Sequence, residues 1–345
     1  MSLRVGIGLF TGQIPAGSER TFAREYRETL ELIRLAEALG FDSAWVSEHH
    51  GASDGYLPSL LVMLAAVAEA TSTIRLGTGL VLTPFHDPLR LAEDAAVVDQ
   101  LSGGRLILGL GLGWRDEEFR MFGIPRSERL PRTVETIELL RQAWTGQRFS
   151  FDGEIFRYDR VRVTPPPAQP GGPAILLGGQ VDASPRRAGR IADGYVTDAD
   201  DLDHVRRSAA LMDEAAREAG RDPSTLHLVL MQNAFVAEDA DAWELVEQGV
   251  FHQLGAYDVW DAGHDTPDHD SLEPVPDDPD EARRITAAGT PEEVTSAIRP
   301  VVSEHAGRAE FEVIVRLHYP GMDLDTAARA VELFGERVLP ALPGG

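Results

Sequence analysis

Short runs of aliphatic and β-branched residues alternate with helical runs along the whole chain. The helices carry clear start signals: Asp87 and Pro88 form an N-cap and N1 pair, and "TPEE" at 290–293 is a capping box. Strands that are each followed by a helix, with no long polar linker, predict an α/β fold, a (β/α)8 TIM barrel, as one domain over residues 1–345. The eight predicted strands are Val5–Phe10, Ser43–Ser47, Ile74–Leu82, Leu106–Gly113, Ala174–Gly178, Gly194–Thr197, Leu226–Val236 and Phe311–His318.

Two segments interrupt this alternation. Residues 114–173 hold more than one element and end in the proline-rich "TPPPAQPGGP", which predicts an insertion between strands four and five. Residues 261–281, before strand eight, carry nine carboxylates, four prolines and no arginine. A segment of this composition cannot form a core, so we expect it to be mobile.

Several residue types are absent, and their absence excludes whole classes of chemistry. The chain has no cysteine, which excludes disulfides, thiolate nucleophiles and cysteine-ligated metals. It also has no lysine, so all 32 basic residues are arginines, and a Walker lysine or a Schiff-base lysine is excluded.

Charge and hydropathy narrow the range of partners. The net charge of -24 opposes binding to nucleic acids or anionic membranes and favours a small-molecule substrate. We expect a cytoplasmic protein, because we find neither an apolar stretch of about 18 residues nor a secretory leader at the N-terminus.

The sequence "WVSEHH" at 45–50 ends predicted strand two with three titratable groups. In a barrel of this kind the C-terminal ends of the strands line the active site, so Glu48, His49 and His50 are candidate site residues. Packing of one histidine, most readily His50, is the simpler alternative. No metal site is predicted, because adjacent histidines on an extended chain point to opposite faces and no spacing requires a contribution from His86 or His318.

Glycines at alternate positions clear one face of two neighbouring strands. They lie in "LGTGLVLT" at 76–83 and in "LGLGLGW" at 108–114, and Gly111 belongs to the second row. This pattern makes room for a flat cofactor, although tight backbone packing is the alternative for either row alone. Neither row matches the dinucleotide fingerprint.

A third motif, "LLGGQVDASPRRAGR" at 176–190, combines features that suit a phosphate. Gly178 and Gly179 end strand five, and Ser184 is predicted to cap the following helix. Free backbone N–H groups, the helix dipole and Arg186 with Arg187 converge there, although an ordinary strand-to-helix loop is the alternative.

Taken together, the motifs resemble the bacterial luciferase-like family of flavin-dependent oxidoreductases. The resemblance covers nearly the whole chain and rests on "WVSEHH", "GTGLVLTPFHDPLRLAEDAAVVDQLSGGRLILGLGLGW", "EEFRMFG", "ILLGGQVDASPRRAGRIADGY" and the ending from "AGTPEEV" to "ELFGERVLPAL". It implies a TIM barrel that holds reduced FMN, or the deazaflavin F420, at the strand ends.

The resemblance also implies roles for individual residues. His49 would be the acid–base group beside the cofactor ring, with Glu48 next to it and Glu118 at an acidic family position near the ring. The acidic segment after position 258 would be a lid. The implied cofactor contacts are Thr78, Gly79 and Leu80, where members often have an unusual cis peptide, together with Gly111 and the phosphate site formed by Gly178, Gly179, Ser184 and Arg187.

One departure from the family affects the functional prediction. Luciferases have a phosphate-binding arginine where this chain has Leu112, so luminescence is not expected and Arg187 or backbone groups must take over that contact. The "EHH" triplet resembles the FMN branch more than the F420 branch.

The leading hypothesis is therefore a two-component monooxygenase. It would use reduced FMN and O₂, with the flavin supplied by a separate NAD(P)H:flavin reductase, to oxidise a small organic substrate. An F420-dependent oxidoreductase, a non-catalytic flavin-binding protein and a metal hydrolase remain alternatives. The resemblance also implies a homodimer.

Overall fold

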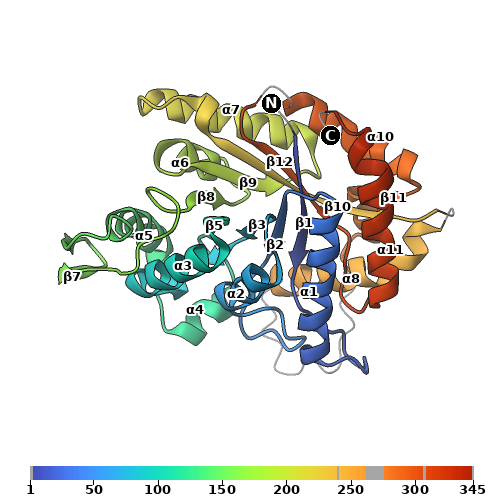
Figure 1. Cartoon of the computed structure of the whole chain (residues 1–345), viewed down its shortest axis with the longest axis horizontal. Coiled ribbons are helices and arrows are strands. Elements are labelled where there is room, and N and C mark those ends of the chain that lie inside the picture. Colours follow the sequence, from blue (N-terminus) through green and yellow to red (C-terminus); the bar gives the residue numbers. More distant parts are fainter. Residues whose placement is uncertain (1–2, 239–240, 262–275, 306–307, 344–345) are drawn as a thin grey trace.

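The computed structural model describes residues 3–238, 241–261, 276–305 and 308–343 (Figure 1). Eight parallel strands form a closed ring, because β12 pairs with β1 and β9 pairs with β10. The (β/α)8 barrel predicted from the alternation is therefore confirmed. The ring consists of β1 (Arg4–Phe10), β2 (Ser43–Val46), β3 (Arg75–Thr78), β5 (Leu106–Gly111), β8 (Ala174–Gly178), β9 (Gly194–Asp198), β10 (His227–Val236) and β12 (Phe311–Arg316).

Predicted strand three is one run in the sequence but two pieces in the structure. After β3 the chain passes through Gly79 and Leu80, whose peptide bond is cis, and resumes as β4 (Val81–Leu82) alongside β5. A short additional strand, β11 (Thr286–Gly289), pairs with the end of β10.

Helices surround this barrel and begin at the caps that the sequence predicts. Asp87 accepts hydrogen bonds from two backbone N–H groups at the start of α3, and Thr290 and Glu293 form the reciprocal bonds of a capping box. The helices are α1 (Phe22–Ala38), α2 (Leu60–Ala70), α3 (Pro88–Ser102), α4 (Asp116–Phe122), α5 (Arg129–Ala143), α6 (Ala183–Ile191), α7 (Leu202–Glu218), α8 (Ala242–Asp261), α9 (Pro279–Ile285), α10 (Pro291–His305) and α11 (Leu324–Leu333).

Residues 114–173, predicted as an insertion, contain α4, α5 and an antiparallel pair of strands, β6 (Phe149–Asp152) and β7 (Arg157–Val161). Because α5 packs against α3, it is part of the helical layer rather than an addition to it. Most of the predicted acidic lid lies outside the described residues. Its last residues are described, and α9 begins there at Pro279 with Asp278 as its N-cap.

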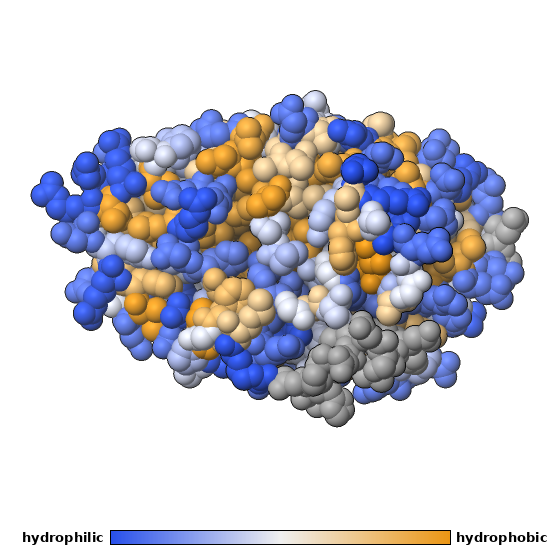
Figure 2. All heavy atoms as spheres, turned by 90° about the horizontal axis from the view of Figure 1, so that it is seen from below, coloured by the Kyte–Doolittle hydropathy of each residue, from blue (hydrophilic) through white to orange (hydrophobic). Residues whose placement is uncertain are grey.

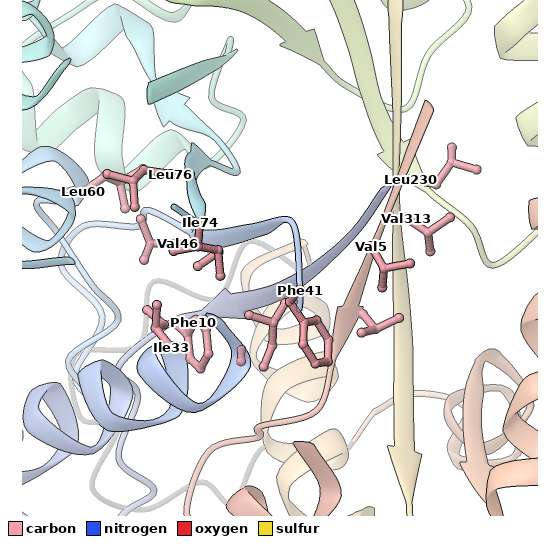
Figure 3. Packing of buried hydrophobic residues seen from close by; sticks show 14 of the residues in the cluster. Val5, Phe10, Ile33, Phe41, Val46, Leu60, Ile74, Leu76, Leu230 and Val313 are labelled. Atoms are coloured by element: carbon pink, nitrogen blue, oxygen red, sulfur yellow. The ribbon is translucent and has the colours of Figure 1, made fainter. Parts of the chain in front are cut away.

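Two sets of apolar side chains fill the two faces of the strands. Figure 3 shows the outer set, in which Val5, Val46 and Leu76 on the strands meet residues of the helical layer such as Ile33. The inner set fills the barrel axis and consists of Trp45, Ile107, Leu176, Val196, Val229 and Ile314. This alternation along each strand leaves only the strand ends free to carry polar groups into the barrel.

Hydrophilic side chains lie over much of the face in Figure 2, with apolar groups between them. This distribution agrees with the high content of carboxylates. No helix among the described residues is both long and apolar enough to cross a membrane.

Candidate active site

His49 lies three residues after the end of β2, in the barrel mouth, with only 4% of its surface exposed. Its Nδ1 is 2.9 Å from Oε1 of Glu118, a buried residue of α4. The same carboxylate oxygen accepts the backbone N–H of His50 at 2.9 Å. An Nδ1–H that donates to a carboxylate leaves Nε2 as the basic nitrogen, and Nε2 has no hydrogen-bond partner within the described ranges.

Arg115 contacts the segment that carries His49 and the carboxylate of Glu118. Its Nη1 donates to the carbonyl of His50 at 2.9 Å and lies 3.5 Å from Glu118 Oε1. The guanidinium also lies 4.0 Å from the ring centroid of Trp260. Arg115 therefore connects the end of β2, helix α4 and the end of α8.

Glu48 has a different environment from His49, although the two are adjacent. Its carboxylate accepts the backbone N–H of Leu82 at 2.6 Å and is 3.1 Å from Nε2 of His86. Burial alone would raise the pKa of Glu48, but His50 and His86 lower it to about 2. Glu48 is therefore a stable carboxylate that ties the end of β2 to the loop after β4.

His50 packs against aromatic rings, as the simpler alternative predicts. Its imidazole is 4.7 Å from the ring of Phe122 and 5.9 Å from that of Phe85, measured between centroids. No cluster of three or more metal-ligating side chains occurs in the part of the chain that the structure describes.

Four aromatic side chains enclose His49, and the sequence motifs did not identify them. Two come from α8, the helix that precedes the acidic segment. Their ring centroids lie 4.8 Å (Tyr56), 6.2 Å (Trp114), 5.5 Å (Tyr257) and 4.9 Å (Trp260) from the imidazole. The mouth of the barrel beside His49 is thus an aromatic enclosure rather than an open slot.

The prediction that the two glycine rows make room for a flat cofactor is wrong. A Cβ added at Gly77 would lie 2.1 Å from the indole of Trp45, and one at Gly109 would lie 2.9 Å from Leu80. Gly111 also faces Leu80, at 3.2 Å from the added Cβ, so these glycines make room for protein side chains.

Thr78 and Gly79 are also engaged within the protein. The Thr78 hydroxyl donates to the carbonyl of Gly109 and accepts from its N–H, both at 2.8 Å. A Cβ at Gly79 would lie 2.5 Å from Leu9. Among the residues predicted to contact the cofactor ring, Leu80 has its side chain in the inner apolar layer of the barrel.

The phosphate motif forms a corner between the end of β8 and the start of α6. Gly179 has φ of +139°, and Ser184 is buried in the first turn of α6. Helix α6 begins at Ala183, so Ser184 lies inside the helix and the prediction that it is the N-cap is wrong. Burial lowers the pKa of Arg187, and the positive charge of Arg129 lowers it further.

Neither guanidinium has a carboxylate partner. Arg187 makes no ion pair within the described residues, and Arg129 Nη1 donates to the carbonyl of Gly113 at 3.1 Å. Arg186, which the sequence grouped with Arg187, instead pairs with Glu214 at 2.8 Å. Arg187, which lies near the N-terminus of α6 and has no ion pair among the described residues, suits a phosphate. Arg129 was missed because it is 58 positions from Arg187 in the sequence and belongs to no local motif.

A cavity of about 710 Å³ is lined in part by Trp260, whose ring lies beside His49. Its walls are α8 and the loops after β1, β2 and β12. Within it, Asp54 lies 3.0 Å from Nε2 of His252 and accepts from Nε2 of Gln13 at 2.7 Å. A cavity of this volume accommodates a small organic molecule.

The family model for luciferase-like monooxygenases matches residues 3–308. The chain belongs to this family, which confirms the resemblance and supports an enzyme. Its relatives include the F420-dependent hydroxymycolic acid dehydrogenase of Mycobacterium tuberculosis, 32% identical over 323 residues, with 90% of this chain and 82% of the relative covered. The F420-dependent glucose-6-phosphate dehydrogenase of Nakamurella multipartita is 30% identical, with 91% and 92% covered.

Solved structures give the same fold. The monooxygenase RslO1 from Streptomyces bottropensis superposes with a TM-score of 0.81 at 29% identity, with 98% of this chain and 99% of that chain covered. The protein is thus an oxidoreductase of the luciferase-like family, whose relatives use a flavin-type cofactor.

Proposed function

We propose that the protein is an F420-dependent oxidoreductase that transfers hydride between a small organic substrate and the deazaflavin. The sequence motifs alone favour FMN, but two relatives that are at least 30% identical over nine tenths of the chain are F420-dependent dehydrogenases. The observation that carries the proposal is the buried His49–Glu118 pair with its free imidazole nitrogen.

The chemistry needs a base beside the reacting carbon. Bound F420 would supply the hydride acceptor. His49 Nε2 takes the proton of the substrate hydroxyl, and Glu118 stabilises the imidazolium that results, because it already accepts the Nδ1–H. The aromatic rings around His49 exclude water from this proton transfer.

The chain's own residues suit the phosphate of such a cofactor. Arg187 and Arg129 would neutralise it, and Ser184 would offer its hydroxyl in the first turn of α6. F420 and FMN both carry a phosphate group, so this corner does not discriminate between them.

Oxygenation with reduced FMN is the second candidate. It is favoured by the 29% identity to the monooxygenase RslO1 over 98% of the chain and by the "EHH" triplet. In that case the protein would require a separate NAD(P)H:flavin reductase as partner. A protein that binds flavin without turnover would show neither activity.

The test is anaerobic titration of the purified protein with F420 and FMN, each oxidised and reduced. We expect F420 to bind at least about tenfold more tightly than FMN, since the F420 relatives are similar along most of the chain. Tight binding of reduced FMN alone would replace the proposal with the monooxygenase, and binding of neither would remove both.

Arg187→Gln tests the phosphate corner with an internal control. We expect it to weaken FMN by about 10- to 100-fold, because charge-assisted hydrogen bonds to the phosphate are lost, and to leave riboflavin unchanged. Arg186→Gln is the matched control, since Arg186 pairs with Glu214. An equal loss for FMN and riboflavin would mean that the phosphate binds elsewhere.

We also propose a homodimer, as in the family resemblance. Three exposed apolar residues on the adjacent helices α2 and α3 offer a surface for it: Val62, Val97 and Leu101, with 71%, 46% and 54% exposure. Sedimentation of Leu101→Glu against the unmodified protein tests this surface.

A further inference from the structure

Arg316 is the last residue of β12 and points into the barrel. Side chains alternate along a strand, and Ile314, two positions earlier, belongs to the inner apolar layer. Arg316 therefore lies on the same face, one step nearer the mouth. Only 5% of its surface is exposed.

The guanidinium of Arg316 has no partner. It makes no hydrogen bond or ion pair with any residue in the described ranges, and Nη1 is fully buried without a partner. An arginine in a protein keeps its charge, and a buried unpaired charge is strongly unfavourable. An unpaired guanidinium at the active-site end of the barrel is available to pair with a bound ligand.

The neighbours of Arg316 connect it to His49. Its positive charge lowers the pKa values of Tyr56 and Tyr257, although burial raises both overall. The two tyrosine hydroxyls are 3.0 Å apart, and the ring of Tyr56 lies 4.8 Å from that of His49. Arg316 therefore lies near the same enclosure, on a strand that only β1 separates from β2.

We propose that Arg316 binds a carboxylate of the substrate, so that the protein acts on an organic acid whose reacting carbon lies at His49. A planar carboxylate matches the two parallel N–H donors of a guanidinium. A phosphate dianion is disfavoured relative to a carboxylate, because Asp198 and Asp200, whose ionisation responds to Arg316, repel two negative charges more strongly than one. This inference rests on the proposed function, in which the barrel mouth holds the reacting substrate.

The site at Arg316 differs from the phosphate corner, and this difference defines the experiment. Calorimetry measures ligand binding to the full-length protein and to the variants Arg316→Gln and Arg187→Gln. The ligands are the carboxylates acetate, lactate and benzoate, the uncharged benzamide, and inorganic phosphate. We expect Arg316→Gln to weaken benzoate and lactate at least about tenfold while benzamide is unchanged. Arg187→Gln should weaken phosphate and leave the carboxylates unchanged.

Three outcomes would overturn the proposal: unchanged carboxylate binding in Arg316→Gln, a preference of the Arg316 site for phosphate, and an equal loss of F420 or FMN affinity in that variant. Arg316→Lys guards against misfolding, because it keeps the charge and should retain part of the carboxylate affinity. Binding is measured without turnover, so failure here leaves hydride transfer intact. Failure to bind either cofactor would instead remove the proposed function and leave the carboxylate site.

Discussion

Strand β12 carries a buried charged residue at each end of the barrel, and the two have opposite environments. At the base, Glu312 accepts hydrogen bonds from the Ser43 hydroxyl and from Trp45 Nε1, the latter at 2.8 Å, and lies 4.0 Å from Arg75. At the mouth, Arg316 projects from the same face of the strand and has no hydrogen-bond or ion-pair partner among the residues that the structure describes.

The same contrast extends beyond this strand. Several other buried polar atoms without a hydrogen bond among the described residues lie near the mouth, on Gln13, Glu118, Gln253 and Trp260, whereas at the base Arg75 Nη1 also lacks a hydrogen bond but lies 4.0 Å from Glu312. Folding stability favours complete pairing, whereas a binding site leaves groups free for a ligand. The base of the barrel therefore stabilises the fold, and the mouth is prepared for binding at a cost in stability.

The largest expected effect is the loss of activity on removing the base at the mouth. His49→Gln should lower kcat about 10²- to 10⁴-fold, because Nε2 no longer takes the substrate proton. Cofactor affinity should change by no more than about threefold, since His49 makes no contact with the phosphate corner. Steady-state kinetics with a substrate found by screening organic acids, together with cofactor titration, measures both quantities.

His50→Gln is the matched control, because its imidazole packs against Phe85 and Phe122. Turnover that survives in His49→Gln, or that falls equally in both variants, would remove the assigned role of His49.

The second prediction compares the two charged residues of β12 directly. Glu312→Ala should lower the free energy of unfolding by about 3 to 5 kcal/mol, because the Ser43 hydroxyl and the Trp45 N–H lose their carboxylate acceptor and the half-buried Arg75 loses a nearby negative charge. Arg316→Met should change it by less than about 1 kcal/mol or increase it, since an unpaired buried charge is removed. Urea denaturation measures both. Equal destabilisation would show that the mouth is as structural as the base.

The third prediction concerns how the free energy of unfolding depends on pH through Glu48 at the mouth. The pKa of Glu48 is about 2 in the folded protein against an ordinary value of 4.5. A depressed pKa stabilises the fold above pH 4.5, and this contribution is lost as the pH falls toward 2. The difference of about 2.5 units corresponds to about 3 kcal/mol.

Urea denaturation of the unmodified protein and of Glu48→Gln at pH 6 and pH 3 gives the test. The difference in the free energy of unfolding between the two proteins should shrink at pH 3. The exposed Glu93→Gln is the control and should show no such change. A difference that is independent of pH would mean that Glu48 is not held as a carboxylate.

The sequence predicts the barrel well because each strand and cap is a local pattern. Asp87 with Pro88, and Thr290 with Glu293, act within four residues of each other, and the structure has both caps. The glycine rows were misinterpreted because their meaning depends on distant partners. Whether Gly77 faces a ligand or Trp45 is decided by the register of β2 against β3, which no local pattern contains.

The candidate site is predictable only in part for the same reason. His49 and Glu118 follow from the family motifs, and the structure brings them together. Arg129, Tyr257 and Trp260 come from other loops and helices, and their types are common in cores and on surfaces. Their convergence at the mouth is a property of the closed ring of strands.

The smallest expected effect separates two tryptophans that are both buried but differ in their pairing. The Trp45 N–H donates to Ser43 Oγ at 2.7 Å and to Glu312 at 2.8 Å, whereas Nε1 of Trp260 is buried without a partner. Trp45→Phe should therefore lower the free energy of unfolding by about 1 to 3 kcal/mol more than Trp260→Phe, because it leaves a buried carboxylate short of a donor. Both substitutions remove similar volume, so each serves as the packing control for the other. If Trp260→Phe proved as destabilising as Trp45→Phe, the indole N–H at the mouth would already be used by the fold rather than left free for a ligand.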